Sequence, residues 1–376
     1  MNITHFLLGR PSPDTANGVE KAVFYLAQAQ AALGHRVTVL SGSAKPVIPI
    51  PLVNVVNFPL HWLRGWLPHG LKAFLRKNRP DLVHFHSSYV PEMARLAAWL
   101  RGEGIPYVAT PQGGCSRHLL RRRAWLKIPY RRLVELPYLN RALFVQALGT
   151  SEEEEIRRYG VRAPLVDVPN GIAPETIPPW SGENFFHRLR PEWKGKVIYV
   201  YVGRLDPVQK GLDLLLDGLA RALKAGVPLG LALVGPDWGG LRGGLEARVA
   251  QAGIASSVLF TGALYGSEKF EAIHSGDFFV HTSRWEGMPF SVLEALACGV
   301  PPFITPAADP GGWVARAGCG VLVEPDAGAI AEGLIRCASL PQEERKAMGA
   351  AGREIARTRL GWSGIARALV GAYAGN

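Results

Sequence analysis

Cysteine is scarce in this sequence, with only four residues spread over a chain of 376. None belongs to a Cys-x-x-Cys pair, so the spacing excludes the common zinc-binding and thioredoxin-type motifs. The chain also lacks the dense cysteine framework of small secreted proteins. We therefore interpret the four cysteines as reduced, structural thiols, at Cys115, Cys298, Cys319 and Cys337.

Long hydrophobic runs are missing as well. The longest apolar stretch without a charge lies between Lys45 and Arg64, and four prolines break it. A membrane-spanning helix needs about 20 consecutive apolar residues without such breaks. The N-terminus has no basic start followed by an apolar run and a cleavage site, so no signal peptide is predicted. We expect a cytoplasmic protein without a transmembrane span.

Acidic residues are few in the first half of the chain. Residues 1–172 carry 22 Lys/Arg against 11 Asp/Glu, whereas residues 173–376 carry 20 of each. The excess is densest in segment 117–132, which has no carboxylate. Such a segment favours contact with an anionic membrane surface or an anionic acceptor, and the plainer alternative is a solvated face. No nucleic-acid-binding motif accompanies the charge, so nucleic acid is not an expected partner. Its basic residues are Arg117, Arg121, Arg122, Arg123, Lys127, Arg131 and Arg132.

Short apolar runs alternate with segments of helical periodicity along the whole chain. Residues 1–8 and 36–40 are predicted strands on either side of a helix from about Val19 to Leu33, which forms a β-α-β unit. A Pro/Gly/Trp-rich stretch, 169–182, interrupts this alternation, which then restarts at 197–203. Further strands are predicted at 82–86, 107–110, 143–147, 166–168, 229–235, 257–260, 277–282, 301–305 and 320–324.

This alternation predicts an α/β fold with two tandem Rossmann-like domains, each built on a mostly parallel sheet. The length agrees, because one hydrophobic core stops growing at roughly 250–300 residues. The predicted boundaries are an N-terminal domain over 1–172, a linker over 173–190, a C-terminal domain over 191–355 and a final segment over 356–376.

The loop after predicted strand 197–203 carries Arg204 and then Lys210-Gly211 at the start of a helix. In open parallel sheets, ligands bind at the carboxyl ends of strands. Arginine can grip two phosphate oxygens, lysine adds a point charge, and a helix N-terminus adds its dipole. The pair is therefore a candidate diphosphate site, although taken alone it could equally be a surface Arg and Lys at the end of a loop.

Two carboxylates follow predicted strand 277–282. Glu286 lies in the loop and Glu294 lies early in a helix that begins near Pro289, so both can approach the top of the sheet. A carboxylate that accepts two ribose hydroxyls is a known solution for nucleotide ribose recognition. Because Pro289 has no N–H, the amides of Phe290 and Ser291 are the candidates for phosphate contact.

Seven segments of the chain together resemble the family 4 glycosyltransferases, which are retaining enzymes of the GT-B fold. They are NGVEKAVFYLAQAQAALGHRVTVLSG, PDLVHFH, VPNGI, YVGRLDPVQKGLDLLLDGL, LVGP, VLFTGAL and HTSRWEGMPFSVLEALACGVPPFIT. The resemblance implies two domains facing an interdomain cleft, with the donor held mainly by the C-terminal domain. It also implies that the final helix, within 356–376, crosses back to the N-terminal domain.

The resemblance further implies roles for individual residues. Arg204 and Lys210 would contact the diphosphate and act in catalysis together with Glu286, which would bind the donor sugar. The donor-binding set would be Glu294 on the ribose, Asn17 and Gly18 near the phosphates, and Gly235, Leu264, Met288, Phe290 and Ser291. Base recognition would use the loop 262–265.

The implied reaction is transfer from a UDP- or GDP-linked sugar to a hydroxyl of a glycan, glycolipid or small acceptor, in envelope polysaccharide or glycoconjugate synthesis. The acceptor would attack from the leaving-group side, so that configuration is retained; Glu286 as a covalent nucleophile is the rival route. No Asp-x-Asp motif precedes the site, so neither a metal nor another cofactor is expected. Two other classes stay open, a glycan phosphorylase-like enzyme and a non-catalytic sugar-nucleotide-binding partner.

One departure from the family lies after predicted strand 107–110. Many relatives have Thr-Pro-His-Gly there, whereas this chain has Gln112 in place of the histidine. A glutamine amide orients a hydroxyl but does not titrate, so we expect Gln112 to position the donor sugar. Weaker candidates for the acceptor side are His86, Arg117 and His118; the His84-x-His86 pair favours packing and hydrogen bonding over metal binding. If the basic segment meets lipid, the enzyme would be peripheral at the inner face of the cytoplasmic membrane.

Overall fold

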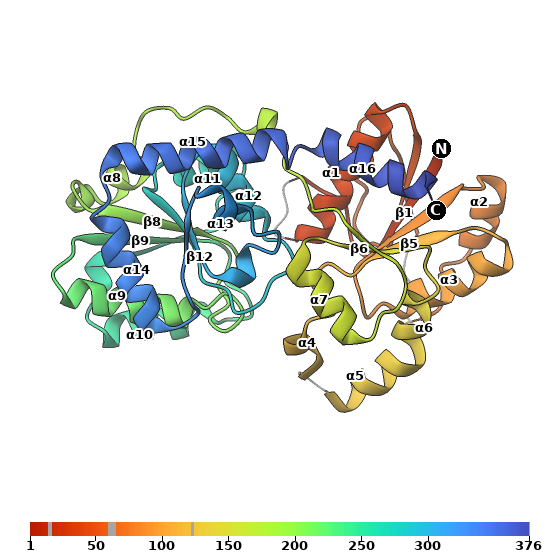
Figure 1. Cartoon of the computed structure of the whole chain (residues 1–376), viewed down its shortest axis with the longest axis horizontal. Coiled ribbons are helices and arrows are strands. Elements are labelled where there is room, and N and C mark those ends of the chain that lie inside the picture. Colours follow the sequence, from red (N-terminus) through yellow and green to blue (C-terminus); the bar gives the residue numbers. More distant parts are fainter. Residues whose placement is uncertain (14–16, 59–64, 122–123, 376) are drawn as a thin grey trace. The chain divides into compact units, whose positions relative to one another are not determined.

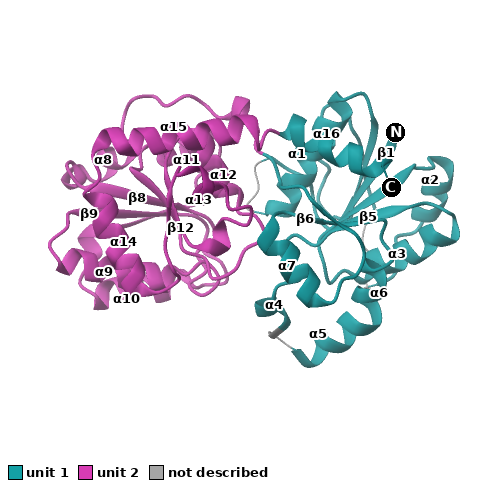
Figure 2. Ribbon diagram, in the orientation of Figure 1, with its two compact units in different colours: residues 1–171, 362–376 teal, residues 172–361 magenta. Residues whose placement is uncertain are grey.

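The computed structural model describes residues 1–13, 17–58, 65–121 and 124–375. The chain forms two compact units, residues 1–171 with 362–376 and residues 172–361 (Figure 2). Each unit is an α/β domain on a parallel sheet, which confirms the predicted fold class.

Unit 1 has a seven-stranded sheet with the order β3-β2-β1-β4-β5-β6-β7, and every pairing between these strands is parallel. Its strands are β1 (Asn2–Leu7), β2 (Arg36–Ser41), β3 (Asn54–Asn57), β4 (Leu82–His86), β5 (Tyr107–Thr110), β6 (Val145–Ala147) and β7 (Leu165–Asp167) (Figure 1). Its helices are α1 (Gly18–Ala32), α2 (Leu71–Lys77), α3 (Pro91–Gly102), α4 (Arg117–Arg121), α5 (Ala124–Tyr130), the π-helix η1 (Arg131–Glu135), α6 (Leu136–Leu139), α7 (Thr150–Tyr159) and α16 (Trp362–Ala374).

The two faces of this sheet are covered by different helices, because side chains alternate along each strand. Val83 and Phe85 of β4 enter a large core with α2, α3 and α6. The opposite face carries His84 and His86 of β4, and there α16 packs against α1. This second face therefore buries polar side chains as well as the apolar ones that pack on α1.

Unit 2 has a six-stranded sheet with the order β10-β9-β8-β11-β12-β13, again parallel throughout its named strands. Its strands are β8 (Val197–Val202), β9 (Leu229–Val234), β10 (Val258–Gly262), β11 (Phe278–His281), β12 (Pro302–Ile304) and β13 (Val321–Leu322). Its α-helices are α8 (Phe185–Leu189), α9 (Leu212–Lys224), α10 (Arg242–Gln251), α11 (Gly266–His274), α12 (Phe290–Cys298), α13 (Trp313–Ala317), α14 (Ala327–Ala338) and α15 (Gln342–Thr358). Short 3-10 turns are η2 (Pro174–Thr176), η3 (Pro191–Trp193), η4 (Ala255–Ser257) and η5 (Pro306–Ala308).

Three features of the structure differ from the organisation predicted from the sequence. The predicted linker 173–190 is part of unit 2, because Phe186 is fully buried there and Asn184 both caps α8 and donates to the carbonyl of Ser275 at 2.9 Å. The final segment 356–376 is not one helix: α15 ends at Thr358 and α16 begins at Trp362. Strand β3, at the edge of the first sheet, was not predicted.

The four cysteines are free and buried, as the sequence indicates. Burial raises the pKa of Cys115 well above its ordinary value. These thiols are therefore packing residues rather than nucleophiles. Within the described ranges, no helix is both long and apolar enough to cross a bilayer.

Candidate active site

Three glycines at the carboxyl ends of neighbouring strands form the floor of the site in unit 2. Gly203, Gly235 and Gly262 follow or end β8, β9 and β10, and the amide of Gly235 donates to the carbonyl of Gly262 at 2.9 Å. A Cβ on Gly235 would lie 1.7 Å from the carbonyl oxygen of Gly203. The backbones at these strand ends therefore approach more closely than any side chain allows.

Lys210 and Glu286 meet beside this floor although 76 residues separate them in sequence. The Lys210 Nζ lies 2.6 Å from Glu286 Oε1, and the two side chains are only 11% and 8% exposed. His281 Nε2 lies 3.1 Å from the same oxygen, and the Ser283 hydroxyl donates to it at 2.6 Å. Glu286 Oε2 has no hydrogen-bond partner among the described residues, so one carboxylate oxygen is fixed and the other is available.

Two further contacts hold the β8–α9 loop, which carries Lys210, against the β11–α12 loop, which carries Glu286. Gly211 adopts a left-handed conformation (φ +63°) and approaches Thr282 so closely that a Cβ would lie 2.0 Å from its carbonyl oxygen. Arg284 then pairs with Asp213 through both guanidinium nitrogens at 2.8 Å, and it also donates to the carbonyl of Val208. This brace joins the β11–α12 loop to the β8–α9 loop, which is how Glu286 reaches Lys210.

The charge state of Glu286 follows from its partners. Burial alone would raise its pKa, but the Lys210 charge and the hydrogen bonds from His281 and Lys210 outweigh burial, so the pKa lies well below the ordinary value. Burial lowers the pKa of His281 against the opposing hydrogen bond to Glu286. Glu286 is therefore an ionised acceptor of hydrogen bonds, with a neutral His281 donating to it.

Arg204 lies beside the site in a different environment. Its guanidinium stacks over the Trp238 ring, 4.4 Å from the centroid, and Trp238 itself is half exposed. Within the described part of the chain, no carboxylate lies within ion-pair distance of Arg204. A stacked arginine without an ion-pair partner is well suited to receive an anionic group.

Glu294, the predicted ribose ligand, lies on α12 and is 5% exposed, and its Oε1 is 2.9 Å from the Nζ of Lys269 on α11. Phe290 and Ser291 begin the same helix, and Met288 precedes it as a buried residue. Leu264 lies in the β10–α11 loop, just before α11. The donor-binding candidates of the second unit thus lie at the carboxyl end of its sheet, where ligands bind in such folds.

In unit 1, Gln112 is held in an unusual backbone conformation. It has a positive φ of 55°, which a residue with a Cβ rarely adopts, and its side-chain oxygen accepts from Asn170 Nδ2 at 3.2 Å. The next amide, of Gly113, donates to Glu152, whose other carboxylate oxygen accepts from the amide of Leu148 at 2.7 Å. Burial raises the pKa of Glu152 to about 7 against these two hydrogen bonds. Such a fixed, strained turn at a strand end is typical of a functional position.

The remaining candidates of unit 1 have varied surroundings. Asn17 caps α1 by accepting from the amide of Val19, and Gly18 begins that helix. Arg117 and His118 are exposed on α4, whereas His86 is buried. Of the predicted basic segment, Arg122 and Arg123 lie outside the described residues.

Four residues of the candidate site were not predicted from the sequence: His281, Ser283, Lys269 and Glu152. His281 ends β11 and Ser283 follows it in the loop that leads to Glu286, so their position at a strand end was an available signal. The sequence carries no such signal for Lys269 and Glu152, because only the folded structure brings each of them to its partner.

Two parallel-sheet units with a buried Lys–Glu pair at one strand end agree with the two-domain glycosyltransferase that the sequence predicts. Residues 16–176 match the model of Glycosyltransferase Family 4, and residues 184–355 match that of Glycosyl transferases group 1. The chain belongs to the family 4 glycosyltransferases, and it is a hexosyltransferase.

Relatives cover most of the chain. It is 26% identical to a phosphatidyl-myo-inositol mannosyltransferase of Mycobacterium tuberculosis, over 96% of this chain and 93% of that protein. It is 31% identical to a GDP-mannose-dependent alpha-mannosyltransferase of the same species, over 65% and 61% of the two chains. The structure resembles sucrose-phosphate synthase from Thermosynechococcus elongatus with a TM-score of 0.81 at 22% identity, over 100% and 98% of the chains.

The two site carboxylates should contribute to different steps. Glu294→Ala should weaken binding of a nucleoside diphosphate by about 10- to 100-fold, as expected for the loss of hydrogen bonds to a charged group. Glu286→Ala should leave that affinity within about threefold but lower turnover, because its free oxygen is predicted to contact the sugar rather than the nucleotide. Calorimetry with GDP and UDP measures the first effect, and Glu268→Ala, an exposed carboxylate on α11, is the control. An equal loss of diphosphate affinity in both variants would contradict this division.

Proposed function

We propose that this protein transfers a hexose, with retention of configuration, from a nucleoside diphosphate sugar to a hydroxyl of a lipid-linked or glycan acceptor at a membrane surface. The observation that carries the proposal is the Lys210–Glu286 pair beside an unpaired Arg204. Two cations and one anchored carboxylate suit a substrate with a diphosphate at one end and sugar hydroxyls at the other.

The chemistry follows from these groups. The bond between the anomeric carbon and the diphosphate oxygen breaks as the acceptor hydroxyl forms a new bond to that carbon. Arg204 and Lys210 stabilise the charge that grows on the diphosphate, and a diphosphate oxygen takes the proton of the acceptor. Glu286 Oε2 accepts hydrogen bonds from the sugar, while Oε1 stays with Lys210, His281 and Ser283.

The environment of Glu286 also argues against the covalent route. Its Oε1 accepts three hydrogen bonds, and its pKa is held well below the ordinary value by Lys210 and His281 despite burial. A carboxylate so strongly stabilised as the anion is a poor nucleophile. The site therefore favours attack by the acceptor from the leaving-group side.

For the donor, we propose GDP-mannose, because relatives named as mannosyltransferases align with this chain over most of its length. A UDP-linked sugar is the second candidate. The test is release of GDP or UDP from each sugar nucleotide, in the presence of vesicles containing phosphatidylinositol or of soluble mannosides. Retention predicts a product with the anomeric configuration of the donor, which NMR of the product reports. An inverted product, or nucleotide binding without transfer to any acceptor, would contradict the proposal.

The membrane contact is assigned to segment 117–132 and the turn after it. Trp125 is 75% exposed and Leu133 is 77% exposed, and Leu126 and Ile128 are exposed too. Pro129 lies inside α5, and the following turn is a π-helix, so the segment is not a regular amphipathic helix. Basic charge with exposed apolar side chains supports shallow, salt-sensitive attachment to an anionic membrane, and hence a peripheral location at its inner face.

Vesicle sedimentation tests this attachment. Vesicles with anionic phosphatidylglycerol should sediment the protein, and neutral phosphatidylcholine vesicles should not, because each basic residue near an anionic surface adds about 1 kcal/mol. Raising salt to 0.5 M should release it, and Trp125→Ala with Leu133→Ser should weaken binding further. Trp180→Ala, which removes an exposed tryptophan of unit 2, is the control. Equal binding to both vesicles, or no effect of salt, would contradict the assignment.

A further inference from the structure

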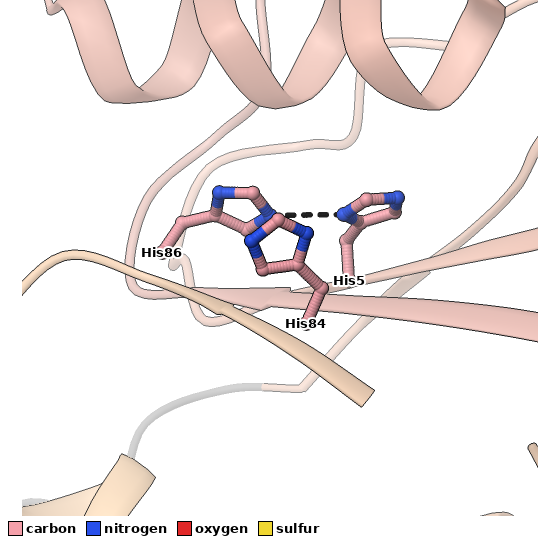
Figure 3. Close-up of side chains that lie close together, drawn as sticks. All are labelled: His5, His84 and His86. Atoms are coloured by element: carbon pink, nitrogen blue, oxygen red, sulfur yellow. Dashed lines mark hydrogen bonds between the residues drawn. The ribbon is translucent and has the colours of Figure 1, made fainter. Parts of the chain in front are cut away.

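Three histidines lie buried together on one face of the sheet of unit 1, where sequence analysis predicted packing and hydrogen bonding for two of them. His5 of β1 is the register partner of His84 of β4, and His86 follows two residues later on the same face. All three are at most 1% exposed. Their side chains lie close together (Figure 3). Burial holds the pKa of His5 at about 4 and those of His84 and His86 well below the ordinary value, so all three are neutral at pH 7.

A neutral imidazole carries one proton, and the partners of His5 fix its position. His5 Nε2 lies 2.7 Å from the side-chain oxygen of Gln30, which can only accept, so Nε2 carries the proton. His5 Nδ1 is then an acceptor. It lies 2.9 Å from His86 Nε2, which must donate to it.

The partners of His84 fix its proton independently. The hydroxyl of Thr110 donates to the side-chain oxygen of Gln146 at 2.7 Å, so it accepts from His84 Nε2 at 2.6 Å. His84 Nδ1 is then an acceptor, and the hydroxyl of Tyr373 donates to it at 2.8 Å. Tyr373 in turn accepts from the amide of Gln30 at 3.3 Å.

The two assignments meet at Gln30 and form one series of hydrogen bonds, in which each group donates to the next. The order is His86, His5, Gln30, Tyr373, His84, Thr110, Gln146 and finally the carbonyl of Val168, which accepts from Gln146 at 2.6 Å. Six of the seven side chains both donate and accept, and His86 donates. Of the nitrogen and oxygen atoms in this series, only His86 Nδ1, at its first member, has no partner among the described residues.

The last members of this series of hydrogen bonds lie on both sides of Gln112. Thr110 lies two residues before Gln112, and Val168 lies two residues before Asn170, which donates to Gln112. Gln146 holds both flanks, because its oxygen accepts from Thr110 and its amide donates to Val168.

We propose that this hydrogen-bond relay links the C-terminal helix α16 to the turn that carries Gln112, and that Tyr373 and His84 are positioning residues for Gln112. When Tyr373 is in place, each donor of the relay has one acceptor, and the two strand ends around Gln112 have one arrangement. Without its hydroxyl, both His84 Nδ1 and the Gln30 amide lose their partner, and the part of the relay on α1 is no longer joined to the part that ends beside Gln112. The catalytic consequence rests on the proposed function, whereas the relay itself does not.

A metal site is the other interpretation of three clustered histidines, whose ligand nitrogens lie within 4.8 Å of one another. The ring geometry argues against it. The rings of His84 and His86 pack against each other with centroids 4.0 Å apart and planes tilted by 31°, which is a ring contact rather than a set of nitrogens directed at one ion. Both nitrogens of His84 are also engaged, by Tyr373 and Thr110.

The experiment is NMR of the full chain labelled with nitrogen-15 in histidine, combined with kinetics of Tyr373→Phe. The relay predicts that His5, His84 and His86 all carry the proton on Nε2 at pH 7.5. In Tyr373→Phe, the Nδ1 signal of His84 should move toward that of a nitrogen without a hydrogen bond. In the same variant kcat should fall about 3- to 10-fold, with the KM for donor unchanged, the size seen for residues that act through a network.

Tyr107→Phe is the matched control, because it also removes a buried tyrosine hydroxyl from unit 1, one that donates to the carbonyl of Tyr138 at 2.7 Å outside the relay. It should leave the three histidine spectra and kcat unchanged. A proton on Nδ1 of His84, or binding of one equivalent of zinc with loss of the histidine signals, would overturn the relay. Correct tautomers with equal kcat in the two tyrosine variants would overturn the positioning role alone, and absence of transferase activity in the wild type would count only against the proposed function.

Discussion

Lys210→Met should lower kcat for sugar transfer by about 100- to 1000-fold, the range for loss of one group that stabilises charge in the transition state. The lysine does two things at once, because its Nζ lies 2.6 Å from Glu286 and it is a candidate diphosphate contact. The variant should also lose about 3–5 kcal/mol of stability, since it leaves Glu286 buried without its ion-pair partner. Steady-state kinetics and urea unfolding measure the two effects.

A double variant separates the two effects. Lys210→Met with Glu286→Gln removes both charges, so most of the stability should return while the activity stays low. Lys224→Met removes an exposed lysine at the other end of α9 and should change neither. Recovery of activity in the double variant would mean that Lys210 only neutralises Glu286 and does not act on the diphosphate.

Gln112→Ala should lower kcat by about 10- to 100-fold while nucleotide affinity changes little, because the amide is proposed to orient a sugar hydroxyl. Gln112→His should stay active, since histidine occupies this position in many family 4 relatives. Gln112→Gly is an informative companion: it also lacks the amide but relieves the left-handed backbone at φ 55°, so it should be more stable than the alanine variant. Turnover at the wild-type rate in the alanine variant, with a saturating acceptor, would remove Gln112 from the site.

The order of strands and helices was largely predictable from the sequence, because buried parallel strands are short apolar runs between amphipathic helices. Strand β3 was missed, since Asn54–Asn57 is an edge strand with only half-buried side chains, next to a stretch rich in proline. Segment 173–190 was predicted as a linker for a similar reason. Its composition is that of a loop, and it is the burial of Phe186 and the hydrogen bond from Asn184 to Ser275 that show its packing in unit 2.

The site was predictable residue by residue but not as an arrangement. Lys210 and Glu286 each stand out at a strand end, yet nothing in the sequence says that they pair with each other rather than with separate partners. The hydrogen-bond relay could not be predicted from the sequence, because it needs side chains from α1, α16 and four strands in one register. Glutamine and threonine at such positions look like ordinary polar residues until the fold brings them together.

The return of α16 to unit 1 sets an order on biosynthesis. Ribosomes add about 5–20 residues per second, so the 190 residues of unit 2 take about 10 to 40 s to make after residue 171 has been joined. Throughout that interval the nascent N-terminal unit lacks Tyr373, and the polar face with His5, His84 and Gln30 stays uncovered. Unit 2 is thus synthesised while unit 1 is still incomplete. A truncation just before Tyr373 would leave His84 Nδ1 and the Gln30 amide without that partner in every copy.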